Sequence, residues 1–115
     1  MRAVLDTNVL IWAARESAKL SAPARSFMRD RANQLVVPPS VSWELAIKHR
    51  KGKLPEAAAL LADYSGLLAR FGAATLPITD AHTLLAGRLE WAHEDPFDRL
   101  VAAVAIVEGL PLISG

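Results

Sequence analysis

The sequence predicts an α/β fold, a three-layer α/β/α sandwich with a short, mainly parallel sheet. Short apolar runs that are typical of buried strands alternate with longer segments of helical periodicity. Such alternation is typical of parallel strands joined by helical crossovers. A length of 115 residues suits one domain with one core, so we expect residues 1–115 to form a single domain.

Four apolar runs are predicted to be strands because each is short and bounded by turn or helix-breaking residues. They cover residues 3–5, 35–37, 73–76 and 110–113. Pro38 ends the second run and Pro77 ends the third, since proline cannot donate to the hydrogen-bond ladder of a sheet.

Six segments place apolar residues at helical spacing and are predicted to be helices. They cover residues 8–14, 21–33, 40–51, 55–71, 80–89 and 97–108. Ser21 and Ser40 are expected to cap the second and third helices, and Thr79 or Asp80 the fifth. Gly109 is expected to end the sixth.

The last two helices carry specific expectations about burial. The fifth should face the core through four apolar residues. These are Ala81, Leu84, Leu85 and Leu89. The sixth is apolar almost all round and should therefore be buried.

Composition limits the functional classes. The formal net charge is +1, with 13 basic and 12 acidic residues, which is not the strongly basic balance of a dedicated nucleic-acid module. There is no cysteine, which excludes disulfides and thiolate metal sites and fits a reducing cytoplasm. No apolar run is long enough to span a bilayer, and the N-terminus lacks a secretory signal. We therefore expect a cytoplasmic protein with no membrane partner.

Three acids lie where elements begin or end. Asp6 directly follows the first strand, Glu44 lies about one turn into the helix after the second strand, and Asp98 lies in the first turn of the last helix. Strand ends and the following helix starts share one edge of a parallel sheet. These carboxylates can converge there, and Mg²⁺ or Mn²⁺ prefers such oxygen ligands. Such an ion can activate water against a phosphodiester.

Each acid also has a structural interpretation. Asp6 alone could be a helix cap, and Glu44 could be a solvated or salt-bridged side chain. Asp95 fits an N-cap, and we prefer that interpretation; Asp98 in the same first turn can be favoured by the helix dipole and still bind an ion. The repeated placement of the acids, rather than any one of them, favours a site.

Several polar neighbours could support these acids. Thr7 and Asn8 either orient Asp6 or cap a helix, and Ser42 is equally ambiguous. Arg99 could pair with a carboxylate or with a phosphate.

The one dense basic cluster lies at the end of the third helix. Its members are Lys48, His49, Arg50, Lys51 and Lys53. Cations at a helix C-terminus ordinarily complement the dipole and are solvated. The sharper alternative is RNA-backbone contact through Lys48, Arg50 and Lys51. The three histidines show no metal-ligand spacing and are interpreted as ordinary polar residues.

These motifs resemble the PIN-domain family, specifically the VapC-type toxins of bacterial toxin–antitoxin pairs. The matching stretches are VLDTNVL at 4–10, SWE at 42–44, AIK at 46–48, GKL at 52–54, AG at 86–87, Trp91, HEDPFDRL at 93–100 and EGLPL at 108–112. The likeness follows the chain in order over nearly its whole length. A distant HEDPFDRL together with LDTNVL is a specific signal.

The resemblance implies an endoribonuclease that depends on Mg²⁺ or Mn²⁺. Asp6, Glu44 and Asp98 match the family's acids, with Asp6 and Asp98 as the main metal ligands. It further implies attack of metal-activated water on an RNA phosphodiester, a homodimer, and inhibition by a cognate VapB-type antitoxin whose C-terminal segment lies across the active-site groove.

The sequence departs from the family in one respect. Family members usually carry a fourth acid just after the last strand, followed by a further short strand, whereas this sequence stops at Gly115. Either the chain continues with this tail beyond Gly115 or the protein lacks it, and in the second case the metal site loses a ligand or a water-positioning acid. Two alternatives stay open: a non-cleaving PIN-like domain that binds RNA or protein, and an RNA-processing nuclease that is not a toxin.

Overall fold

The computed structural model describes residues 1–114, and its centre is one parallel sheet. The strands are β1 (Arg2–Leu5), β2 (Gln34–Val37), β3 (Ala73–Thr75) and β4 (Leu112–Ile113). Their spatial order is β3-β2-β1-β4, and every pairing is parallel. The predicted α/β fold is therefore confirmed.

The register of the sheet centres on β1. Val4 pairs with Val36 of β2 on one side and with Leu112 of β4 on the other. The last three residues of β1 are fully buried, as expected for a central parallel strand. All four strands run the same way, so their carboxyl ends, including the end of β1 at Asp6, share one edge.

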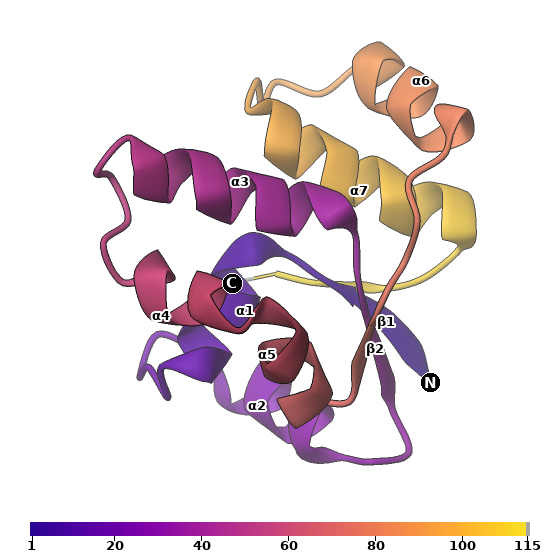
Figure 1. Cartoon of the computed structure of the whole chain (residues 1–115). Coiled ribbons are helices and arrows are strands. Elements are labelled where there is room, and N and C mark those ends of the chain that lie inside the picture. The colour runs from indigo at the N-terminus through magenta and orange to yellow at the C-terminus, as the bar shows by residue number, and fades with distance from the viewer. Residues whose placement is uncertain (115) are drawn as a thin grey trace.

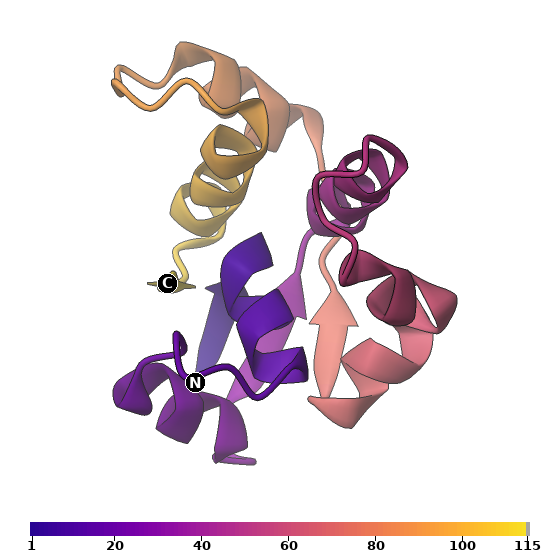
Figure 2. The same ribbon diagram turned by 90° about the vertical axis from the view of Figure 1, so that its left-hand side faces the viewer.

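Seven helices occur within residues 1–114. They are α1 (Thr7–Ala14), α2 (Ala22–Arg29), α3 (Pro39–Arg50), α4 (Ala57–Ala62), α5 (Tyr64–Arg70), α6 (Asp80–Arg88) and α7 (Pro96–Glu108). Helix α3 lies beside the first part of α7, and α6 packs on the outer side of α7 (Figure 1). Helix α1 crosses in front of the strands in Figure 2, with α3 and α7 toward the ends at which the arrows point. None of these helices is long and apolar enough to cross a membrane.

Two predicted helix boundaries are confirmed by their capping geometry. The Ser21 hydroxyl accepts the Ala24 N–H at 3.2 Å at the start of α2. Gly109 ends α7 in the left-handed region with φ of 65°, where a residue without Cβ is favoured.

Other predicted boundaries are wrong. Ser40 does not cap α3, because Pro38 is the N-cap residue and Ser40 lies inside the first turn. The helix predicted over 55–71 is two helices, since Asp63 adopts a non-helical φ of −146° and its carboxylate accepts the Gly66 N–H, which starts α5. Helix α2 ends at Arg29, several residues before the predicted end.

The predicted burial of the last two helices is partly wrong. Ala81 and Leu84 are exposed, and His82 faces the core instead, where it bonds to the Thr79 N–H and to Glu108. Helix α7 is buried in its middle, but Ile106 in its last turn is 59% exposed. Helix α6 packs on α7 beside that turn without covering it, so an apolar surface is left open.

Candidate active site

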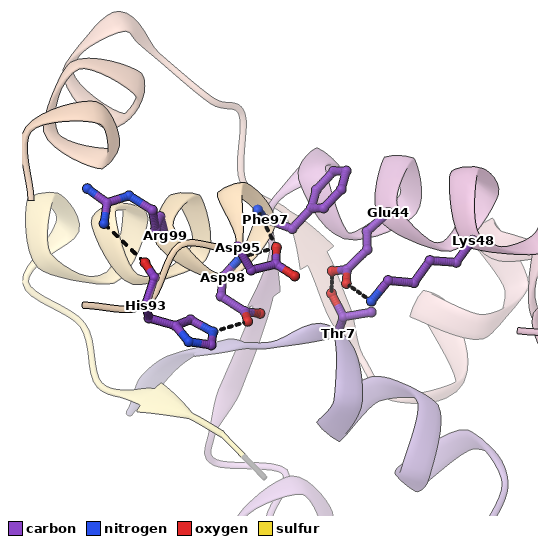
Figure 3. Close-up of polar contacts among 8 residues, drawn as sticks. All are labelled: Thr7, Glu44, Lys48, His93, Asp95, Phe97, Asp98 and Arg99. Carbon is purple, nitrogen blue, oxygen red and sulfur yellow. Dashed lines mark hydrogen bonds and ion pairs between the residues drawn. The ribbon is translucent and has the colours of Figure 1, made fainter. Parts of the chain in front are cut away.

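Glu44 is the buried acid of the candidate site. It lies in α3 on the side that faces the start of α1 and is 3% exposed. Its Oε1 atom accepts a hydrogen bond from the Thr7 hydroxyl at 2.5 Å (Figure 3). Thr7 is the first residue of α1 and follows Asp6 directly. The end of β1 is therefore tied to α3 through a carboxylate.

Lys48 holds the other oxygen of this carboxylate. One helical turn after Glu44, its ammonium donates to Glu44 Oε2 at 2.5 Å. The hydrogen bond with Glu44, reinforced by the negative charges of Glu44, Asp95 and Asp98, raises the pKa of Lys48, although burial acts in the opposite direction. The ammonium thus lies in the field of acids from both α3 and the start of α7.

Asp95 and Asp98 form the start of α7. The Asp95 carboxylate caps the helix by accepting the N–H groups of Phe97 at 2.9 Å and Asp98 at 3.4 Å, so the preferred interpretation of Asp95 as an N-cap is confirmed. The Asp98 carboxylate points away from the helix axis and contacts His93 Nε2 at 2.5 Å (Figure 3). The ring of Phe97 contacts that of Trp43 edge-to-face at 5.1 Å between centroids, which fixes α7 against α3.

Asp6 combines two of the interpretations drawn from the sequence. Its Oδ1 atom accepts the Val9 N–H at 2.9 Å, so Asp6 is the N-cap of α1. It also stands at the carboxyl edge of the sheet, next to the Thr7 residue that binds Glu44. A carboxylate can accept several hydrogen bonds, so the capping bond does not by itself conflict with a second role for Asp6.

Arg99 makes contacts that differ from both sequence-based interpretations. Its guanidinium donates to backbone carbonyls on the segment between α6 and α7 and at the end of α6. The acceptors are the carbonyls of Ala86, Leu89, Trp91 and His93, at 2.7 to 3.1 Å. Arg99 therefore holds the chain that carries His93, the residue that contacts Asp98, against α7.

The remaining predicted residues lie elsewhere on α1 and α3. Asn8 is exposed in the first turn of α1, and the Ser42 hydroxyl donates to the Pro39 carbonyl of its own helix at 2.9 Å. Arg50 and Lys51 are exposed at the end of α3, where they complement the helix dipole. The interpretation of His93 as an ordinary polar residue is incomplete, because its ring contacts the carboxylate of Asp98, five residues further along the chain.

The acids fit a divalent ion in the chemistry of their oxygen atoms. Carboxylate oxygens are the ligands that Mg²⁺ and Mn²⁺ prefer, and the acids of the two helices already act on one cation, the Lys48 ammonium. Within residues 1–114, no three His, Asp or Glu side chains are yet arranged around a common point. Binding of a divalent ion by these acids would need Glu44 to release Lys48, Asp98 to release His93, and the carboxylates to rotate toward one another.

Comparison of the sequence and the fold with known proteins shows the family of this chain. Residues 3–115 match the sequence profile of the PIN domain. The chain belongs to the PIN-domain family. Its fold is similar to a chain in the crystal structure of VapBC2 from Rickettsia felis bound to a DNA fragment from their promoter. The TM-score is 0.67 at 20% sequence identity, over 99% of this chain and 87% of that chain. Curated protein sequences contain no significant match. The resemblance to PIN domains is confirmed.

Proposed function

We propose that this PIN-domain protein is an endoribonuclease toxin of the VapC type. The observation that supports the proposal is that Lys48 pairs with the buried Glu44 of α3 while the negative charges of Asp95 and Asp98, at the start of α7, also help to raise its pKa. Buried and half-buried acids gathered at one place repel each other unless a cation neutralises them. Hydrolysis of a phosphodiester on a divalent ion uses acids placed close together in this way.

The residues of this chain have distinct roles in the proposed reaction. Asp6, Glu44 and Asp98 would hold Mg²⁺ or Mn²⁺, which when bound supplies Lewis-acid stabilisation of the phosphodiester and favours deprotonation of an attacking water. The Thr7 hydroxyl orients Glu44. His93 orients Asp98, and the four contacts of Arg99 hold the segment that carries His93. The exposed Arg50 and Lys51 extend the site with charges that attract the RNA backbone.

The proposed partners follow from the fold relative. The similar chain belongs to a VapBC2 assembly bound to promoter DNA, so we propose that a VapB-type antitoxin neutralises this protein. We also propose a homodimer in the cytoplasm. Ile106 and Val107, which are exposed in the last turn of α7, supply apolar side chains for such contacts. Light scattering tests the dimer, and an Ile106→Lys substitution should reduce its mass to that of one chain.

Cleavage assays test the activity with a matched control. Purified protein is incubated with total RNA, and separately with single-stranded DNA, in Mg²⁺, Mn²⁺ or EDTA. Asp98→Asn should abolish cutting, whereas Asp80→Asn, which changes an acid in the first turn of α6, should not. Equal RNA cutting with ion and with EDTA would contradict the mechanism. RNA binding without cutting would favour the non-cleaving alternative.

Expression in cells separates a toxin from a processing nuclease. Growth should stop on expression of the wild-type chain and continue with Asp98→Asn at equal protein level. Cutting in the tube without growth arrest would favour an RNA-processing nuclease over a toxin. Growth arrest that survives Asp98→Asn would show that cleavage is not its cause.

A further inference from the structure

Lys48 already engages the carboxylate that a divalent ion would need. Glu44 accepts the Thr7 hydroxyl on Oε1 and the Lys48 ammonium on Oε2, each at 2.5 Å. Mg²⁺ binds oxygen at about 2.0–2.1 Å and repels a neighbouring ammonium. Glu44 Oε2 therefore cannot bind both cations in this geometry.

The two partners of this ion pair differ in their freedom to move. The Glu44 side chain is 4% exposed and is held from the other side by Thr7, whereas the Lys48 side chain is 39% exposed. Lysine carries its charge on a flexible four-carbon stem. Lys48 can therefore move its ammonium into solvent by rotating, while Glu44 stays where it is.

The ammonium also compensates acids beyond its own helix. Asp95 and Asp98, at the start of α7, add attraction to that of Glu44. Glu44 would be costly to keep buried and ionised without a nearby positive charge. Lys48 thus performs for the ion-free protein the neutralisation that a divalent ion performs when bound.

We propose that Lys48 is a resident counter-ion that competes with the divalent ion for Glu44. The inference rests on the proposed function, because it takes Glu44 as a ligand of that ion. It predicts that the wild-type protein binds the ion more weakly than its acids allow, since each binding event must displace the ammonium. An ordinary i,i+4 helix pair, by contrast, would only stabilise α3.

Mn²⁺ affinity separates these two roles. Titration calorimetry with Mn²⁺ alone, without RNA, compares the wild type with Lys48→Met, which removes charge and hydrogen bond, and with Lys48→Gln, which retains a donor. Both variants should bind Mn²⁺ roughly two- to tenfold more tightly, the range expected for losing one competing charge whose own side chain is partly exposed. Lys53→Met removes one exposed charge at the end of the same region and should leave the dissociation constant unchanged.

Thermal unfolding supplies a second readout. Lys48→Met should lower the melting temperature of the ion-free protein, because Glu44 loses its counter-ion, and saturating Mn²⁺ should raise it by more than in the wild type. Circular dichroism checks that each variant is folded, and Lys48→Gln retains a hydrogen bond if Lys48→Met does not fold.

The outcomes distinguish failure of this inference from failure of the proposed function. Unchanged or weaker Mn²⁺ binding in both Lys48 variants, with binding lost in Asp98→Asn, would overturn the counter-ion role and leave the ion site intact. Equal Mn²⁺ binding by the wild type and Asp98→Asn, or no binding by either, would overturn the site and the inference together. Tighter binding in both Lys48 variants, and not in Lys53→Met, supports the counter-ion role.

Discussion

Replacing Thr7 by Val tests the link between the sheet edge and the candidate site. Valine keeps the size and β-branching of threonine but removes the hydroxyl that donates to Glu44 Oε1 at 2.5 Å. Thr7 and Glu44 are both buried, so water cannot replace the lost donor without opening the packing between α1 and α3.

The expected cost follows from the charge on the acceptor. A hydrogen bond to an ionised group contributes roughly 1.5–3 kcal/mol, and Lys48 remains on Oε2 to hold part of the charge. We expect Thr7→Val to lower the free energy of unfolding by about 2 kcal/mol, measured by urea denaturation. The melting temperature should fall by roughly 10 °C for a domain of this size.

Two comparisons make this result specific to the contact. Thr83→Val removes a hydroxyl that donates to the Asp80 carbonyl on the exposed face of α6 and should change stability by less than about 0.5 kcal/mol. In a Glu44→Gln background the effect of Thr7→Val should be roughly halved, because the acceptor is neutral. If Thr7→Val matches Thr83→Val within error, the buried contact does not hold Glu44, and the argument built on it is wrong.

Three further substitutions or titrations probe the surroundings. Arg99→Lys should lower the free energy of unfolding by roughly 1–3 kcal/mol, because an ammonium cannot reproduce the four carbonyl contacts of the guanidinium. Amide hydrogen exchange over residues 89–95 should become faster, and unchanged exchange would contradict this role of Arg99. Ser40→Ala should raise the free energy of unfolding by about 0.5–1 kcal/mol, because the buried Ser40 hydroxyl has no hydrogen-bond partner within residues 1–114. A loss of stability would show that this hydroxyl does have a partner. Burial raises the pKa of Tyr64 from 10.0 to about 12. The folded state therefore holds the phenol proton more tightly than the unfolded state, and the free energy of unfolding should fall as pH rises from 10.0 to about 12. Tyrosinate absorbance measures this pKa directly, because the chain has a single tyrosine, and ionisation near pH 10.0 would refute the shift.

The fold and the approximate place of the acids could be predicted from the sequence. Apolar runs and helical spacing indicate strands and helices directly, and the parallel order brings strand ends to one edge. The helix caps at Ser21 and Asp95 could also be predicted, because each capping side chain bonds to a backbone N–H within three residues of its own position. The division of the 55–71 segment was missed because the Asp63 cap competes with continuous helical spacing, and periodicity alone favours the unbroken helix.

The partners of the polar residues depend on packing and could not be predicted. A Glu and a Lys four residues apart occur on many solvated helices, and only the burial of Glu44 against α1 makes this pair unusual. Arg99 donates to carbonyls of a segment whose path is fixed by the packing of α6 on α7. His82 is buried because its ring accepts the Thr79 N–H and contacts Glu108, a long-range match without a sequence pattern.

Anomalous scattering from a crystal grown with Mn²⁺ tests directly whether Asp6, Glu44 and Asp98 hold a divalent ion. We expect one strong peak among the carboxylates of Asp6, Glu44 and Asp98, with the Lys48 ammonium moved away from Glu44 Oε2. A map with no peak there, or with Lys48 still bonded to Glu44 beside an ion held by other residues, would contradict it.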